Sequence, residues 1–139
     1  MIGKLVKILR SKPENGWHSF RVPQIGEVVV HCLPLEFAKA NKYAEVWARI
    51  PTGNLSFREF RGSAEEVARR ICLEFLKPPS KKVELAVSMV RNSEFDGMRP
   101  PEVAAMLDLD DEVTFKAFDF LAKCGEVENR NELGWFRSA

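Results

Sequence analysis

The chain has 139 residues, of which 45% are hydrophobic and 29% are charged. This length suits one domain or two small ones, and the globular composition excludes global disorder. No apolar run approaches the ~20 residues of a membrane span, and the charged start "MIGKLVKILRSK" is unlike a signal peptide, so we expect a soluble cytoplasmic protein.

The net charge of +1 conceals a division between two parts of the chain. Residues 1–77 contain 13 Lys and Arg against 8 Asp and Glu, a net charge of +5, whereas residues 78–139 contain 8 against 12, a net charge of −4. The two prolines of "LKPPSKK" (76–82) would stop a helix and form a short linker. We therefore predict two domains, 1–77 and 78–139, with different partners.

The first part is predicted to be a β-rich domain with one helix. The segment "GSAEEVARRICLEFLK" (62–77) predicts the helix, because Ser63 suits an N-cap, Glu66 follows three residues later and apolar residues recur at a spacing of four. β-branched and aromatic residues between turn residues indicate five strands, at 4–10, 17–22, 27–33, 43–50 and 55–61.

The start of this domain resembles the small oligonucleotide-binding (OB) barrel at the beginning of some RecD-type helicases. The resemblance covers residues 3–34 and implies a barrel that binds single strands. An OB barrel often has its helix between strands three and four, but here the clear helix follows strand five, so a five-stranded meander is the alternative. The matching residues are Gly3, Val6, "ENGW" (14–17), "RV" (21–22) and "GEV" (26–28).

Aromatic and basic residues of the predicted strands suggest a surface for single-stranded nucleic acid, since such surfaces combine basic grooves with aromatic faces on which bases stack. Trp17 and Arg21 share one strand parity, and Tyr43, Trp47 and Arg49 share one face of another strand. The alternative is that Trp17, Trp47 and Phe57 form the small core while the basic side chains are solvated. The candidate nucleic-acid-binding residues are Lys7, Lys12, Trp17, Arg21, Lys42, Tyr43, Trp47, Arg49, Arg58 and Arg61.

The second part changes to a helical pattern. Apolar spacing predicts helices over 81–92, 99–109 and 110–124, the second with a proline at its start, and Gly125 suits the position after the third helix. The segment "EVENRNELGWFRS" (126–138) indicates two short strands around a turn.

This order resembles a winged-helix domain, and its layout is similar to the C-terminal winged helix of the middle subunit of replication protein A. The matching residues are "PPEVAAMLDL" (100–109), then Thr114, Phe118 and Leu121 at core spacing, then Gly125-Glu126-Val127. The resemblance implies a domain that recruits proteins, although winged helices as a class also bind DNA.

The third predicted helix occupies the place of a recognition helix, yet its sequence is unsuited to DNA. Its acidic start, "DDE" (110–112), favours the helix dipole but would repel phosphates, and a DNA-reading helix would offer Arg, Asn, Gln, Ser or Lys. We expect this domain to contact protein; the alternative is that its phenylalanines pack against the first domain. The candidate partner residues are Phe115, Lys116, Asp119, Phe120 and Trp135.

Catalysis, cofactor binding and metal binding are not indicated. His18 and His31, the two histidines, lie in no HxH or HExxH pattern, the three cysteines form no CxxC pair, and neither GxxxxGK[ST] nor GxSxG occurs. The segment "DLDDE" (108–112) lacks the ligand alternation of a calcium loop and suits a turn and a cap.

The sequence therefore predicts a non-catalytic α+β protein associated with nucleic acid, such as a replication or repair accessory. Its first domain would contact single strands and its second domain would contact protein, without a membrane or cofactor. The alternative is a protein–protein adaptor or an inhibitor of a nucleic-acid machine, including one encoded by a phage or mobile element, that makes no contact with nucleic acid. In a further alternative the opposite charges attract the two domains to each other.

Overall fold

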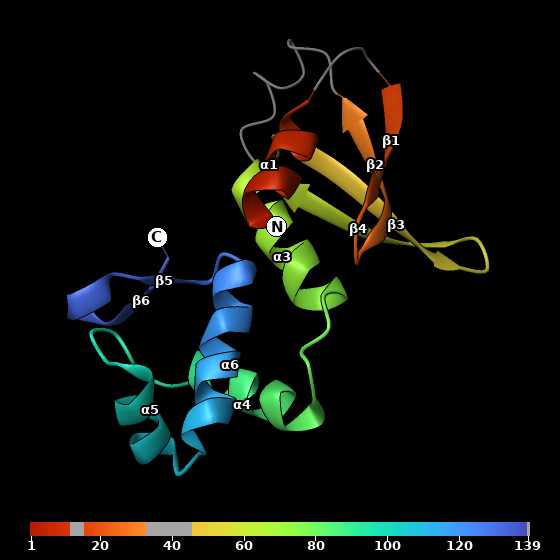
Figure 1. Ribbon diagram of the computed structural model, residues 1–139. Coiled ribbons are helices and arrows are strands. Elements are labelled where there is room, and N and C mark those ends of the chain that lie inside the picture. The colour runs from red at the N-terminus through yellow and green to blue at the C-terminus, as the bar shows by residue number, and fades with distance from the viewer. Residues whose placement is uncertain (12–15, 33–45, 139) are drawn as a thin grey trace. The chain divides into compact units, whose positions relative to one another are not determined.

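The computed structural model describes residues 1–11, 16–32 and 46–138 (Figure 1). The chain divides into two compact units, Met1–Leu76 and Lys77–Ala139. The division lies one residue before the predicted boundary, just ahead of Pro78 and Pro79. Each unit has its own buried apolar residues and is described separately.

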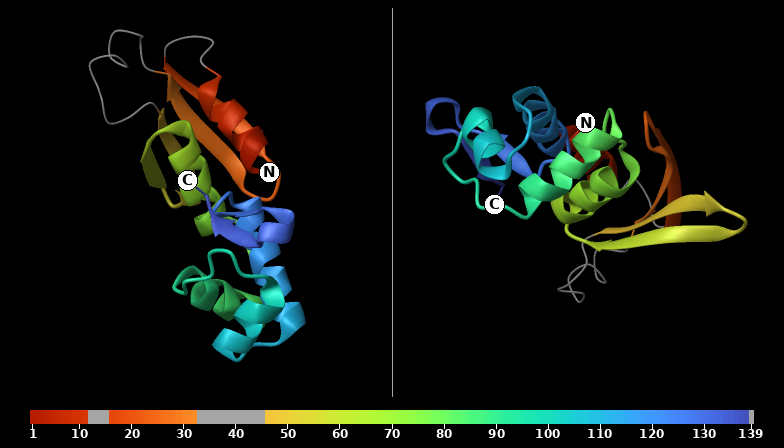
Figure 2. Two further views of the ribbon diagram at one scale, coloured as in Figure 1. Left: turned by 90° about the vertical axis from the view of Figure 1, so that its left-hand side faces the viewer. Right: turned by 90° about the horizontal axis from the view of Figure 1, so that it is seen from below.

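The first unit is an antiparallel sheet with helices on one face. Strands β1 (Gly16–Val22), β2 (Gly26–Cys32), β3 (Val46–Gly53) and β4 (Ser56–Gly62) pair in chain order, so β1 and β4 are the edges of the sheet within the described residues. Helices α1 (Ile2–Arg10) and α3 (Ala64–Phe75) pack against each other and on the same side of the sheet (Figures 1 and 2). The predicted α+β class is confirmed.

The predicted first strand is wrong, because residues 4–10 belong to helix α1. Ile2, Leu5 and Leu9 recur at spacings of three and four, and both leucines are fully buried, so the helical period outweighs the β propensity of the individual residues. The described part of this unit therefore has four strands instead of five and two helices instead of one. Its sheet is an open meander and not a closed OB barrel.

Alternation along the strands separates a buried face from the opposite face of the sheet. In β3, Val46, Ala48 and Ile50 are buried beneath the helices. Phe60 of β4 belongs to the same core, and its ring centroid lies 6.2 Å from that of Phe75 in α3. Alternate residues of each strand thus form the core beneath the helices. The residues between them point to the opposite face of the sheet.

The second unit contains the predicted helices and hairpin in the predicted order. Helices α4 (Lys81–Arg91) and α5 (Pro100–Leu107) both pack against α6 (Asp111–Lys123) around buried Phe95, Phe118 and Leu121. Met98 forms an isolated antiparallel bridge to Trp135, which adds a third short segment beside the hairpin. The hairpin consists of β5 (Val127–Asn129), the 3-10 turn η1 (Asn131–Leu133) and β6 (Trp135–Arg137).

The helix ends follow local sequence signals. The Ser63 hydroxyl accepts a hydrogen bond from the Glu66 N–H at 3.2 Å, and the Asp110 carboxylate accepts from the N–H groups of Glu112 and Val113. Gly125 follows α6 with φ 74°, a left-handed conformation that glycine adopts without a Cβ clash.

None of the described helices combines the length and the apolar character that a membrane span requires.

Candidate nucleic-acid interface

The face of the sheet opposite α1 and α3, called the open face below, collects side chains from all four strands. The pairing register aligns these side chains in rows across the sheet. Residues from distant parts of the sequence thereby become neighbours. The first row is Trp17, His31, Trp47 and Arg61, and the second row is Ser19, Val29, Arg49 and Glu59.

Trp17, His31 and Trp47 form a continuous aromatic cluster. The ring centroid of Trp17 lies 4.6 Å from that of His31 and 5.1 Å from that of Trp47, in edge-to-face geometry, and the His31 and Trp47 centroids are 5.5 Å apart. Trp17 is 41% exposed, whereas His31 and Trp47 are half-buried. The cluster therefore exposes the indole of Trp17 to solvent, with His31 and Trp47 packed against it.

Two arginines lie against this cluster at cation–π distances. The Arg49 Cζ is 4.4 Å from the ring centroid of Trp17 and 5.0 Å from that of Trp47, and the Arg61 Cζ is 4.0 Å from that of Trp47. Phe57, which is 51% exposed, lies 5.7 Å from the Arg49 Cζ. Aromatic and cationic groups are thus interleaved on the open face.

The acidic groups of the open face have local partners. Glu59 Oε1 lies 2.8 Å from Arg49 Nε as an ion pair, although the geometry is not that of a hydrogen bond. Glu27 accepts a hydrogen bond from the Ser19 hydroxyl at 2.7 Å.

Two further basic side chains, Arg21 and Arg61, lie on the open face. Arg21 lies opposite Glu27 in the register, yet neither it nor Arg61 makes an ion pair with a carboxylate of the described residues. Arg21 belongs to β1 and Arg61 to β4, so each edge strand carries one cation without such a partner in the described part of the chain.

Among the described residues, the buried atoms His31 Nδ1 and Trp47 Nε1 lack a hydrogen-bond partner, and Arg49 Nε has only its ion pair with Glu59. Buried polar atoms without a partner are uncommon in folded proteins, because such an atom has lost its bonds to water without replacing them. The three atoms occur together at the aromatic cluster, and this distinguishes the open face from the rest of the described sheet.

The structure places half of the predicted nucleic-acid-binding residues on the open face: Trp17, Arg21, Trp47, Arg49 and Arg61. Lys7 lies on α1, behind the sheet, because its segment is a helix. Arg58 points to the helix side of β4, where its Nε bonds to Glu74 Oε1 at 2.7 Å. Lys12, Lys42 and Tyr43 lie outside the described residues.

The alternative in which Trp17, Trp47 and Phe57 form the core is wrong, since these side chains lie on the open face and the core occupies the opposite face, where Phe60 is buried. Sequence reasoning also missed members of the interface. His31, Phe57 and Glu59 join it only through the cross-strand register, and single-strand parity carries no information about which residues lie opposite one another.

The predicted partner residues of α6 divide into exposed and buried positions. Phe115 is 60% exposed, Lys116 Nζ lies 3.2 Å from Glu112 Oε1, and Asp119 pairs with Lys123 at 3.7 Å. Phe120 is buried, with 7% of its surface exposed, and its contact with a partner stays a prediction. The apolar face of α6 is wide because it packs against both α4 and α5. Trp135 is half-buried, with its ring centroid 5.2 Å from that of Phe118.

Comparisons of the chain with family models, with curated proteins and with solved structures found no match.

Within the described residues, no group of three or more His, Cys, Asp or Glu side chains could hold a metal ion. Burial raises the pKa of the Cys72 thiol in α3 to about 11, so this thiol is protonated at neutral pH and is a weak nucleophile. The geometry of the open face is therefore the strongest indication of function.

Proposed function

We propose that the chain is a non-catalytic binding protein whose first unit holds single-stranded nucleic acid on the open face. The observation that carries this proposal is the cluster of Trp17, His31 and Trp47 with the guanidinium groups of Arg49 and Arg61 against it. Stacking of a base on an aromatic side chain contributes about 1–3 kcal/mol and requires base faces that a duplex keeps covered. The open face should therefore prefer single strands.

The charges of the open face support a binding mode led by stacking. Arg21 and Arg61, which have no carboxylate partner among the described residues, are available to phosphates, while Arg49 is already paired with Glu59. Each neutralised phosphate of a single strand adds about 0.7 to the slope of log affinity against log salt. Two such contacts give a slope of roughly 1.4, a shallow dependence on salt. The proposal rests on these side chains and does not require a closed OB barrel.

For the second unit we propose contact with a protein partner through a winged-helix arrangement. Its element order supports that arrangement, and α6 supports the choice of partner. The first turn of α6 contains Asp111 and Glu112, while Lys116 and Lys123 each pair with an acid one turn earlier. Phe115 of α6 and Leu133 of the hairpin turn are largely exposed and offer apolar contacts.

The proposal is tested by fluorescence anisotropy of labelled single-stranded and duplex oligonucleotides titrated with the chain at low and moderate salt. We expect micromolar binding of the single strand, weaker binding of the duplex and a shallow salt slope. Equal binding of duplex and single strand would contradict recognition by stacking. If neither oligonucleotide binds at low salt, the nucleic-acid proposal is wrong. The alternative of a protein–protein adaptor or an inhibitor of a nucleic-acid machine is then favoured.

A further inference from the structure

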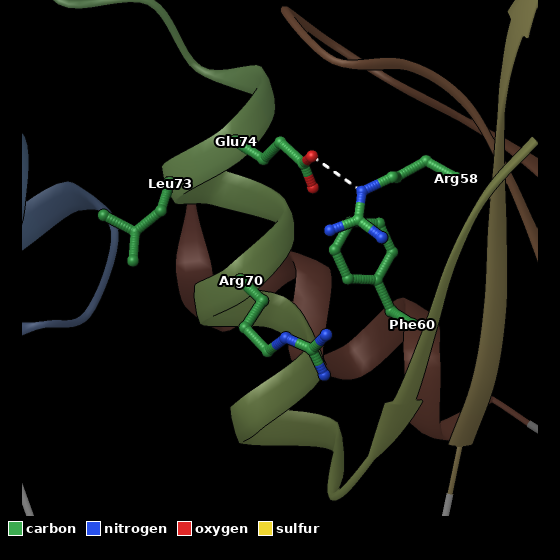
Figure 3. Close-up of a pocket in the computed structure, with 5 residues that line it drawn as sticks. All are labelled: Arg58, Phe60, Arg70, Leu73 and Glu74. Atoms are coloured by element: carbon green, nitrogen blue, oxygen red, sulfur yellow. Dashed lines mark hydrogen bonds and ion pairs between the residues drawn. The ribbon is translucent and has the colours of Figure 1, made fainter.

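A pocket lies between β4 and α3, on the side of β4 that faces away from the open face (Figure 3). Its volume is about 240 Å³, which is room for a phosphate group with several waters, each of about 30 Å³. The pocket combines an aromatic ring, an aliphatic side chain and three charged groups. Its lining residues are Arg58, Phe60, Arg70, Leu73 and Glu74.

The pocket carries one more positive charge than negative charge. The Cζ atoms of Arg58 and Arg70 lie 5.1 Å and 5.3 Å from the ring centroid of Phe60, so both guanidinium groups lie near the same ring. Glu74 pairs with Arg58, but no carboxylate of the described residues pairs with Arg70. A guanidinium with unused donors suits the oxygens of a phosphate, which it can contact through two parallel hydrogen bonds.

Arg70 also connects this pocket to the open face. Its Nη1 donates to the backbone carbonyl of Arg61 at 3.4 Å, while the Arg61 side chain lies over Trp47 on the other side of β4. Because β4 is an edge strand, no other strand of the described residues lies beyond it. Arg61 and Arg70 therefore lie on opposite sides of one sheet edge, and neither has a carboxylate partner in the described part of the chain.

We propose that a single strand bound to the open face leaves it across the edge strand β4 and places a backbone phosphate in the pocket between Arg58 and Arg70. This inference rests on the proposed function of the open face and adds a second contact site on the helix side of the sheet. A short oligonucleotide fills the open face alone, whereas a longer one also reaches the pocket.

The test compares oligonucleotides of about 4 and about 12 nucleotides, within the range of site sizes known for small single-strand-binding domains. Arg70→Gln should weaken binding of the long oligonucleotide about threefold to tenfold at low salt and lower its salt slope by about 0.7, while binding of the short one is unchanged. Lys7→Gln, which removes the same charge from α1, is the matched control and should leave both affinities unchanged.

A second variant should increase the affinity for the long oligonucleotide, a result that misfolding would not produce. Glu74→Gln removes the carboxylate of the pocket and frees Arg58, so the long oligonucleotide should bind about threefold more tightly and the short one should bind as before. If wild type binds both lengths and neither variant changes the difference between them, the pocket inference is wrong while the open-face proposal stands. If wild type binds neither length, both are wrong.

Discussion

The open face of the first unit and the exposed side of α6 both carry basic and aromatic residues, but their electrostatic arrangements are opposite. On the open face, Arg21 and Arg61 have no carboxylate partner among the described residues, and Arg61 lies over the ring of Trp47. On α6, Lys116 and Lys123 each lie beside an acid, and the first turn of the helix is acidic. The difference teaches that the pairing of basic side chains, more than their number, decides where a phosphate can bind.

The largest expected effect is on the free energy of unfolding, and it should differ between the two faces of β4. Phe60→Ala should lower the free energy of unfolding by about 3–5 kcal/mol, because Phe60 is fully buried beneath α3. Phe57→Ala should lower it by less than about 1 kcal/mol, since Phe57 is half exposed on the open face. Urea unfolding followed by circular dichroism measures both. Similar losses for the two variants would show that the open face is part of the core.

The next effect concerns stacking. Trp47→Ala should weaken single-strand binding by about 1–3 kcal/mol, roughly fivefold to 150-fold, because it removes half of the indole cluster and the ring beneath Arg61. Phe115→Ala, which removes an exposed aromatic ring from α6, is the matched control and should leave the affinity unchanged. Anisotropy gives the affinity, and circular dichroism checks the fold. An unfolded Trp47→Ala variant would assign Trp47 a role in the core instead.

A smaller effect concerns the free cations of the open face. Arg61→Gln should lower the salt slope of single-strand binding by about 0.7, the contribution of one phosphate contact. The same change at Lys7 on α1 should leave the slope unchanged, because Lys7 lies behind the sheet. Equal reductions for the two variants would mean that binding responds to net charge alone.

The smallest effect is expected at α6. Lys116→Glu should scarcely alter single-strand affinity, because Lys116 is paired with Glu112 and lies in the second unit. Its stability cost should be about 0.5–1 kcal/mol, because an exposed helical ion pair is lost and the introduced glutamate would repel Glu112 one turn away. A tenfold loss of affinity measured by anisotropy would show that α6 contacts nucleic acid and would remove the contrast between the two surfaces.

Signals confined to one element predicted much of this fold. The cap at Ser63 and the glycine after α6 each act through neighbouring residues, and the structure confirms both predictions. Residues 4–10 were assigned to a strand because short apolar runs do not distinguish a helix from a strand, and the burial of Leu5 and Leu9 decides the matter only in three dimensions.

The candidate site was less predictable for a related reason. Strand parity placed Trp17 with Arg21 and Trp47 with Arg49, but the contacts between strands depend on register. The Arg49–Glu59 ion pair and the place of His31 between the tryptophans follow from that register. The burial of Phe120 depends on what packs against α6, which the sequence of that helix alone does not specify.

The most direct test of the open-face proposal follows the indole N–H signals of the three tryptophans by heteronuclear magnetic resonance during titration with a single-stranded oligonucleotide. Single Trp→Phe variants assign the signals. We expect the signals of Trp17 and Trp47 to shift together and saturate, while that of Trp135 in the second unit stays in place. A shift confined to Trp135, or no shift at concentrations where anisotropy reports binding, would contradict the open face as the binding surface.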